Sequence, residues 1–458
     1  MGNVLRICGL AFFVAASMAL HADPAVVHSR IGTEARSADG GITLRLVDKR
    51  QSYSGAERST YDAAISSPKS VNFHPSGKKF YVNSLEGGKT VVYSTGEPSE
   101  RIKVIDHRFT AKDSPLWAPE SGFYKFRHYH NNVNTFMGKP VESAFTHGGR
   151  YLWVPYYRRS FDINAQDPSA VAVIDTETDS IVRLMEAGVL PKMIAASPDG
   201  RMLAITHWGD NTVGLVDVSS PSPADWRHAG LVAVDKQIFW DLSLSVPRDR
   251  DVGSGNALRG TVFMPDGRHL LVGCMGGNGG VAVIDVDSMR CLGKLRGMMS
   301  NVRHLVISGD HLYLSVNGAG YVQRVPLDSV AEAIAVMDGG DRVLTGWESC
   351  KVGAGARTIE LTPDGRYLFA ACNNVSKIYV VDTRTMAVVT SIDVDSYPVG
   401  LDISGDGTML IVTSQGKKGG GGNAVNIYRI MRPIDVSAVF SHVFNVGVGV
   451  SLMMSLII

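Results

Sequence analysis

The sequence predicts an all-β fold: a seven-bladed β-propeller of four-stranded antiparallel blades, with the ring closed by an N-terminal strand. Seven turn sequences rich in Gly, Asp and Pro recur along the chain, and seven strand ends, most of them Asp, alternate with them. In the compact units the period is about 42 residues, which suits four short strands. The 49 glycines in 458 residues favour many tight turns over long helices.

The first 22 residues predict a secretory signal peptide. Arg6 gives a positive start, residues 7–20 form an apolar run, and Ala22 is the small residue that a signal peptidase requires. A retained membrane anchor is the alternative, but a span needs about 20 apolar residues. We therefore expect an exported protein of the periplasm or cell surface. Cleavage removes Arg6 and leaves 44 basic and 44 acidic side chains, so net charge indicates no partner.

Residues 23–40 are expected to form an N-terminal linker and residues 41–436 the propeller. Between Ile42 and Asp48, apolar and polar residues alternate as in a half-buried strand. Since no comparable strand follows Met431, we predict that residues 41–48 complete the seventh blade and join the two chain ends. The tail, residues 437–458, is uncharged and long enough to span a membrane. A membrane anchor, a packed terminal strand and a poorly ordered end all remain open for it.

Each blade is expected to begin with an apolar strand that runs into one of the repeated turns. Gly, Asp, Asn and Pro suit such turns because they adopt or stabilise the tight backbone. The turns are residues 74–77, 146–149, 197–200, 264–267, 308–310, 362–365 and 404–407. The third strands are expected to end at Asp106, Asp175, Asp217, Asp285, Pro326, Asp382 and Met431.

Several of these segments resemble the YVTN β-propeller repeat family, among them Ser197-Pro-Asp-Gly-Arg-Met-Leu-Ala-Ile-Thr-His and Asn278-Gly-Gly-Val-Ala-Val-Ile-Asp. The resemblance covers about Lys69 to Met431 and is specific for fold, not for activity. The family includes cell-surface and periplasmic binding proteins, and its repeat is similar to propellers of amine dehydrogenases, haem-d1 nitrite reductases and lactonases. This sequence departs from those enzymes, because it has no haem-attachment motif and no complete catalytic set. No cofactor or metal is therefore expected.

Basic residues recur at one position of the repeat, four residues before the apolar residue that precedes each turn. The two-residue period of a strand puts this position on the same face as that apolar residue, and radial symmetry brings the seven positions to one mouth of the central channel. Like charges gathered there are unfavourable unless they are solvated, paired with acids, or bound to an anion. Pairing and an anion site both remain open, and Arg favours carboxylate or phosphate. The basic residues are Lys69, Lys192, Arg259, Arg303 and Arg357.

Polar and aromatic residues at the ends of the second strands are expected on the same rim. They would supply hydrogen bonds and a stacking surface around a small ligand. The alternative is that the Asn residues only make turns. These residues are His207, Trp208, Asn211, Asn317 and Asn373. Glu142, His304 and Asp210 are candidates for acid–base chemistry near the rim, but the sequence singles out no catalytic residue.

Long spacings in blades 1, 2 and 7 predict extended loops between their second and third strands. The loops, around residues 84–100, 156–169 and 414–422, are expected to form a lip on one side of the channel. Four cysteines follow the signal peptide, namely Cys274, Cys291, Cys350 and Cys372. Disulfides and buried free thiols are both open for them.

The leading hypothesis is an exported binding or scaffold protein, not an enzyme, whose cationic channel mouth holds an anionic small molecule, a glycan or a peptide of a protein partner. One alternative is a propeller enzyme of lactonase or dehydrogenase type. Another is a protein that binds single-stranded nucleic acid at the same ring, with strongly salt-dependent affinity. Membrane association through residues 437–458 is a further expectation.

Overall fold

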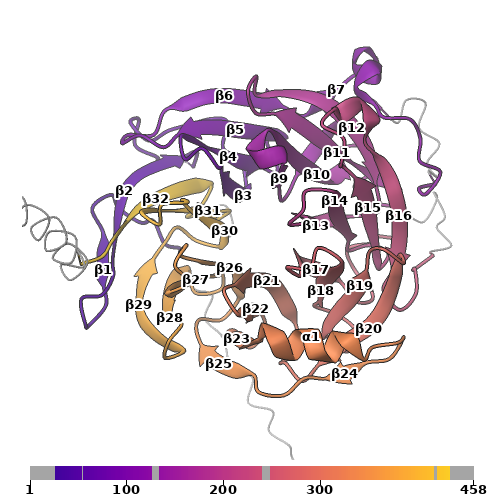
Figure 1. The fold of residues 1–458 in the computed structure, drawn as a ribbon. Helices are drawn as coiled ribbons and strands as arrows, with labels where there is room; N and C mark the ends of the chain where they lie inside the picture. Colours follow the sequence, from indigo (N-terminus) through magenta and orange to yellow (C-terminus); the bar gives the residue numbers. More distant parts are fainter. Residues whose placement is uncertain (1–25, 54, 126–133, 240–247, 417–419, 434–458) are drawn as a thin grey trace, which may run out of the picture.

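The structure is a computed structural model that describes residues 26–53, 55–125, 134–239, 248–416 and 420–433. Seven sheets surround a central axis, with the first strand of each repeat innermost (Figure 1). This arrangement confirms the predicted seven-bladed β-propeller. The predicted signal peptide, residues 1–22, and the apolar tail, residues 437–458, lie outside the described residues. Within the part of the chain that is described, no helix is long and apolar enough to cross a membrane.

Three blades follow the plain four-stranded pattern in sequence order. Blade 1 contains β3 (Pro68–Phe73), β4 (Lys79–Ser84), β5 (Lys89–Ser94) and β6 (Arg101–Asp106). Blade 3 contains β13 (Pro191–Ala196), β14 (Met202–His207), β15 (Thr212–Asp217) and β16 (Arg227–Ala233), with the 3-10 helix η3 (Pro223–Asp225) before β16. Blade 6 contains β26 (Ala356–Leu361), β27 (Tyr367–Cys372), β28 (Lys377–Asp382) and β29 (Ala387–Asp393).

The other blades carry additional elements. Blade 2 contains β9 (Ala144–Thr146), β10 (Tyr151–Arg159), β11 (Ser169–Asp175) and β12 (Ser180–Ala187), and β7 (Arg108–Phe109), η1 (Ala111–Leu116), β8 (Phe136–Pro140) and η2 (His147–Gly149) accompany them. Blade 4 contains β17 (Leu258–Phe263), β18 (His269–Cys274), β19 (Val281–Asp285), β20 (Arg290–Arg296) and the short parallel strand β24 (Arg342–Val343). Blade 5 contains β21 (Val302–Ser308), β22 (His311–Val316), β23 (Tyr321–Pro326) and β25 (Glu348–Lys351), with helix α1 (Leu327–Ala335) between the last two.

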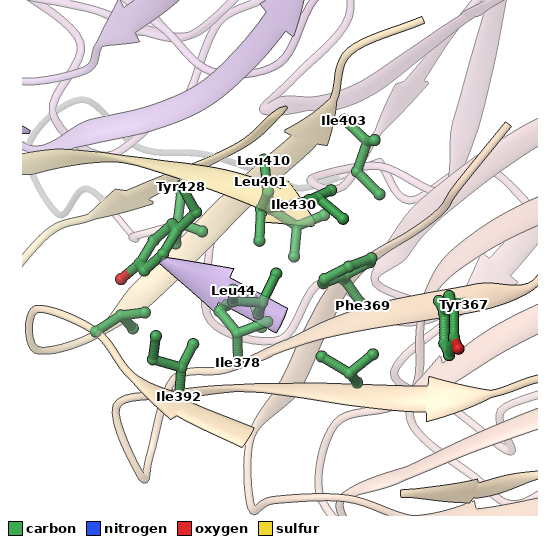
Figure 2. Packing of buried hydrophobic residues seen from close by; sticks show 14 of the residues in the cluster. Leu44, Tyr367, Phe369, Ile378, Ile392, Leu401, Ile403, Leu410, Tyr428 and Ile430 are labelled. Carbon is green, nitrogen blue, oxygen red and sulfur yellow. The ribbon is translucent and has the colours of Figure 1, made fainter. Parts of the chain in front are cut away.

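Blade 7 is built from both ends of the propeller. Its strands are β30 (Pro398–Ile403), β31 (Met409–Ser414), β32 (Ala424–Met431), β2 (Thr43–Gln51) and β1 (Glu34–Arg36). β2 pairs antiparallel with the whole length of β32, which confirms the predicted closing strand. Leu44 of β2 is fully buried in the cluster that also contains Phe369 and Ile378 of blade 6 and Tyr428 of β32 (Figure 2). The closing strand therefore seals the hydrophobic interface between blades 6 and 7 and leaves no free edge on β32.

The segment expected as a linker, residues 23–40, contributes β1 to the same blade. Glu34 to Arg36 pairs antiparallel with the first residues of β2 and so covers its outer edge. Upstream of β1, the Ser29 hydroxyl donates to the buried carboxylate of Asp395 over 2.6 Å. The described part of this segment is thus tied to the propeller.

The repeated turns close through their own side chains. At residues 197–200, the Ser197 hydroxyl donates to Asp199 Oδ1, which also accepts from the backbone N–H of Arg201 at 3.1 Å. Gly200 has a φ of 71°, a left-handed conformation that glycine adopts without strain. The Thr362–Asp364 and Ser404–Asp406 pairs make the same hydroxyl–carboxylate bond. The recurring Ser/Thr-x-Asp-Gly pattern is therefore a self-bonded turn between the first and second strands.

The prediction for blade 1 is wrong in one respect. Its third strand is β5, which ends at Ser94, whereas Asp106 ends the fourth strand, β6. Residues 84–100 are therefore not one long loop and do not form part of a lip. The misreading arose because β6 ends in Val-Ile-Asp, as third strands do in other blades, while β5 ends in Tyr-Ser. In blades 2 and 7 the extra residues do fall between second and third strands.

The four described cysteines are free thiols. Cys274 and Cys372 are fully buried in the hydrophobic clusters between blades, and burial raises the pKa of each thiol to about 12. Cys274 and Cys372 therefore contribute to the packing between blades as small apolar residues.

Candidate functional site

The start of each innermost strand has a repeated and strained backbone. In six blades the residue two positions before the predicted ring position is left-handed, with φ between 49° and 79°. These residues are Ser67, Leu190, Ala257, Asn301, Gly355 and Tyr397. In the same six blades the register of the first strand against the second shifts at the ring position itself. A left-handed turn followed by a β-bulge therefore begins the innermost strand, and such bulges redirect side chains near functional sites.

A β-bulge, and not the alternation of side chains along a strand, brings the five basic residues together. Val71 and Phe73 of β3 pack in a hydrophobic cluster between blades, so strict alternation would bury Lys69 in that cluster too. Instead, Lys69 Nζ lies 2.7 Å from Glu142 Oε1 on the neighbouring blade. The basic side chains gather because the bulge turns them towards the channel, and not because of the two-residue period.

Glu142 binds two of the five basic residues. Its Oε1 accepts from Lys69 Nζ of blade 1 at 2.7 Å and from Arg259 Nη2 of blade 4 at 3.3 Å. Lys69 and Arg259 are only 5% and 4% exposed. Burial would raise the pKa of the Glu142 carboxyl, but Lys69 and Arg259 together lower it below its ordinary value. A single carboxylate thus connects blades 1, 2 and 4 across the channel mouth.

The ammonium group of Lys192 contacts two aromatic rings and the carboxylate of a second acid, Asp251. Its Nζ is 3.8 Å from the centre of the Tyr157 ring and 4.9 Å from that of Trp208, and both distances suit cation–π contact. Asp251 Oδ1 lies 3.2 Å from the same Nζ, while Asp251 Oδ2 accepts from the Tyr157 hydroxyl at 2.7 Å. Asp251 belongs to the insertion before blade 4, which therefore reaches the mouth at blades 2 and 3.

Arg303 and Arg357 have no acidic partner within 4 Å among the described residues. Arg303 Nη1 contacts the sulfur of Met275 at 3.0 Å, and Arg357 lies 5.8 Å from the centre of the Tyr397 ring. The Nε atoms of both guanidinium groups are buried and have no hydrogen-bond partner in the described ranges. Five basic side chains therefore share two carboxylates, and the uncompensated charge is on blades 5 and 6.

Burial and mutual repulsion act on the charge state of the ring. Burial lowers the pKa of Arg303 well below its ordinary value, and Arg357 and Arg259 lower it further. Burial is also the main cause of the lowered pKa of Lys69, to which the same two arginines contribute. These effects mean that the five side chains lie close enough to repel one another in a poorly solvated place. An anion bound there would relieve both costs.

A cavity of about 120 Å³ lies on the axis beside the ring. Most of its lining residues belong to the innermost strands, between the ring position and the repeated turns, while Glu142 and Ser143 directly precede β9. Four of them are titratable: Glu142, His304, Glu360 and Asp402. Burial lowers the pKa of His304 to about 4, so this imidazole is neutral. Two of the three candidates for acid–base chemistry, Glu142 and His304, thus line the same central cavity.

His207 does not reach the rim as predicted. It is fully buried in blade 3, where its Nε2 accepts from the backbone N–H of Gly188 at 2.9 Å and its Nδ1 lies 2.8 Å from the Thr212 hydroxyl. The Thr212 hydroxyl donates to Asp210 Oδ1 at 2.7 Å, so His207 carries its proton on Nδ1. Burial lowers the pKa of His207 to about 3. His207 and Asp210 therefore belong to a structural hydrogen-bond relay.

Replacing Thr212 with Val is expected to lower the free energy of unfolding by about 2 kcal/mol, because the isosteric change leaves both His207 Nδ1 and Asp210 Oδ1 without their buried partner. Urea unfolding measures the difference. Thr206→Val on β14 is the matched control, since this buried hydroxyl makes only long bonds of 3.4 Å. Equal losses in the two variants would contradict the relay.

The predicted asparagines connect successive blades. Asn317 Nδ2 donates to the carbonyl of Ala356 at 3.0 Å, and Asn211 Oδ1 accepts from the backbone N–H of Asn256 at 2.8 Å. Asn211 is itself left-handed, with a φ of 61°. Asn373 is buried, and its Oδ1 has no hydrogen-bond partner in the part of the chain that the structure describes. These residues serve turns and blade contacts, and of the five predicted rim residues the structure brings only Trp208 into contact with the ring.

Several residues of the site were not predicted. Tyr157 lies near the end of β10, which is longer than the second strands of the other blades, and Asp251 lies in the insertion before blade 4, so the repeats mark no equivalent position for either. Glu360 and Asp402 directly precede the apolar residues before their turns, so comparing that position across the repeats would have shown two acids on adjacent blades. Within the described ranges, no group of three His, Cys, Asp or Glu side chains is arranged to hold a metal ion.

Comparisons with known proteins support the fold. No family model matches the chain. Antigen Lp49 of Leptospira interrogans is 25% identical over 175 residues, which span 34% of this chain and 36% of that protein. The match therefore covers about a third of the length of the curated relative.

Two solved structures are similar in shape at 13% sequence identity. Kuenenia stuttgartiensis hydrazine synthase has a TM-score of 0.56, and the match covers 84% of this chain and 99% of that one. The β-propeller domain of Cps50 (Swd1) from Myceliophteria thermophila has a TM-score of 0.54, with 79% and 96% covered. At this identity the likeness shows the fold alone. A propeller supports a binding or scaffold role in general terms.

Proposed function

We propose that this protein is an exported binding protein whose cationic channel mouth holds a small anionic molecule. The observation that carries the proposal is the pair Arg303 and Arg357, two partly buried arginines without an acidic partner among the described residues. Guanidinium groups bind carboxylate or phosphate through two parallel hydrogen bonds. The bound anion would supply negative charge to balance the basic residues that Glu142 and Asp251 do not neutralise.

The dimensions of the site favour a small ligand over a polymer. The cavity of about 120 Å³ is smaller than the roughly 300–1,000 Å³ of sites for drug-sized molecules. The basic groups are close enough to lower one another's pKa. A compact cluster of this kind suits a small anion better than a nucleic-acid backbone, which binds along an extended basic groove. Export and membership of the YVTN repeat family are parts of the proposal, supported by residues 1–22 and by the self-bonded turns.

The experiment is a titration with phosphate, acetate and citrate in a low-salt buffer, followed by thermal unfolding and calorimetry. We expect at least one anion to stabilise the wild type, and the Arg303→Met, Arg357→Met double variant to lose tenfold or more in affinity. Met keeps most of the aliphatic stem and removes the charge. The matched control is Arg227→Met, Arg290→Met, which removes two arginines from the outer strands β16 and β20.

Equal stabilisation of the double variant and the wild type would overturn the anion site. Binding of single-stranded DNA that weakens steeply with salt, together with no response to small anions, would favour the nucleic-acid alternative. Turnover of a lactone or an amine that is lost in Glu142→Gln or His304→Gln would instead favour an enzyme.

A further inference from the structure

A methionine sulfur lies against a basic residue of the channel mouth. Met275 Sδ is 3.0 Å from Nη1 of Arg303, one of the two arginines without an acidic partner in the described chain. Met275 directly follows β18 of blade 4, as Trp208 directly follows β14 of blade 3. Trp208 in turn lies 4.9 Å from Lys192 Nζ. At this equivalent position, two successive blades therefore place an uncharged side chain against a cation of the ring.

The contact with Met275 leaves the Arg303 guanidinium group short of hydrogen-bond acceptors. A guanidinium group has five N–H donors, and a thioether sulfur is only a weak acceptor. The Nε of Arg303 is buried and has no hydrogen-bond partner among the described residues. A stronger acceptor on the Met275 sulfur would therefore receive a charge-assisted hydrogen bond from Arg303.

The Met275 side chain is both accessible and held in place. It is partly exposed, and the residues after it, 276–280, are four glycines and one asparagine, so this turn supplies little cover for the sulfur. The Met275 N–H donates to the carbonyl of Ala257 at 3.3 Å, and the Met275 carbonyl accepts from Asn301 Nδ2 at 3.2 Å. A small solute can therefore reach a sulfur whose backbone is fixed beside Arg303.

The four described cysteines compete poorly with this thioether for an oxidant. Peroxides react with the thiolate form of cysteine, so a protonated thiol is slow to react. Burial raises the pKa of Cys274 and Cys372 to about 12, and it also raises the pKa of Cys291 and Cys350. These thiols are therefore protonated at neutral pH, whereas a thioether needs no deprotonation to react.

We propose that Met275 is a modification site at which oxidation by a peroxide weakens anion binding to the channel mouth. Hydrogen peroxide transfers one oxygen atom to the sulfur: its O–O bond breaks, a sulfur–oxygen bond forms, and water leaves. The thioether is oxidised by two electrons to the sulfoxide, and the peroxide is reduced. The sulfoxide oxygen accepts from Arg303 in place of an oxygen of the anion. This inference rests on the proposed anion site and adds its regulation.

The test is calorimetry of the full chain with phosphate, acetate and citrate, before and after treatment with hydrogen peroxide. Peptide mass spectrometry locates the oxidised methionines. We expect conversion of Met275 to the sulfoxide to weaken anion binding about tenfold, an effect within the range of one hydrogen bond to a charged group. Methionine sulfoxide reductase with a dithiol should restore the affinity, since the dithiol is oxidised to a disulfide and the oxygen leaves as water. Met275→Gln, whose amide oxygen stands in for the sulfoxide oxygen, should bind anions weakly without peroxide.

Met137→Leu is the matched control, because the Met137 sulfur also contacts an arginine, the exposed Arg108, at 3.8 Å. This variant should lose affinity on peroxide treatment as the wild type does, whereas Met275→Leu should have the same affinity before and after treatment. If Met275 is oxidised and anion affinity does not change, or if Met137 is oxidised and Met275 is not, this inference fails while the anion site stands. If the untreated wild type binds none of the three anions, the proposed function itself fails. Unfolding curves of each protein separate a lost fold from a lost site.

Discussion

Without any added anion, the Arg303→Met, Arg357→Met variant is expected to be more stable than the wild type, by about 1–4 kcal/mol in the free energy of unfolding. Both arginines are partly buried, with buried Nε atoms, and have no acidic partner in the described chain. Each adds to the repulsion among the positive charges of the ring, since Arg357 lowers the pKa of Lys69 and Arg303 lowers that of Lys192. Uncompensated buried charge is a cost to the folded state, so its removal should raise the urea midpoint. The same substitutions are expected to weaken anion binding.

Opposite effects on stability and binding would identify these arginines as binding groups. The outer control, Arg227→Met, Arg290→Met, should change stability by less than about 1 kcal/mol, since both side chains are mostly exposed and in surface ion pairs. A double variant of the ring that is clearly less stable than the wild type would mean that the guanidinium groups are structural. The measurement needs low ionic strength, because chloride and sulfate are themselves anions.

The second large effect is on the pH dependence of stability. Burial raises the pKa of Glu360 to about 8 and that of Asp402 to about 7. In the unfolded chain both carboxyls ionise near pH 4, so between about pH 4 and pH 8 the folded state keeps protons that the unfolded state has released. These groups therefore favour folding less and less as the pH rises through this window. Glu360→Gln, Asp402→Asn should be more stable than the wild type by several kcal/mol at pH 9, because each unit by which folding raises a carboxyl pKa costs about 1.4 kcal/mol above that pKa.

Near pH 4 the variant and the wild type should differ little, because the neutral carboxyls and the amides can make similar hydrogen bonds. The difference between the two proteins is the informative quantity. Lys69 and Lys192 have pKa values well below the ordinary one, and they make the folded state more stable as the pH rises. Glu142 and His304 line the same cavity and are unchanged in the variant. A stability difference that does not depend on pH would contradict the protonated pair.

The repeats made much of the fold predictable. Turn residues such as Asp199 and Gly200 stabilise the backbone of the few residues around them, so a short stretch of sequence is enough to identify the turn. Seven repetitions of the pattern make a chance occurrence improbable. The closing strand was predictable because Leu44 and Leu46 alternate with polar neighbours and the last blade lacked a strand. Asp106 was misplaced for the same reason, since a local pattern does not state which strand of a blade it ends.

The number of blades, the closing strand, most of the turns and the recurrence of basic residues at one position could be predicted from the amino-acid sequence. What those basic residues contact depends on how the blades are placed around the axis. Their direction depends on a β-bulge, and their partners Glu142 and Asp251 come from other blades. The acids Glu360 and Asp402 come together only because the adjacent blades 6 and 7 pack side by side at the cavity. The net charge at the channel mouth depends on acidic and basic side chains that come from blades all around the ring. The repeat specifies each blade, whereas closure of the ring brings one residue from each blade to a common point.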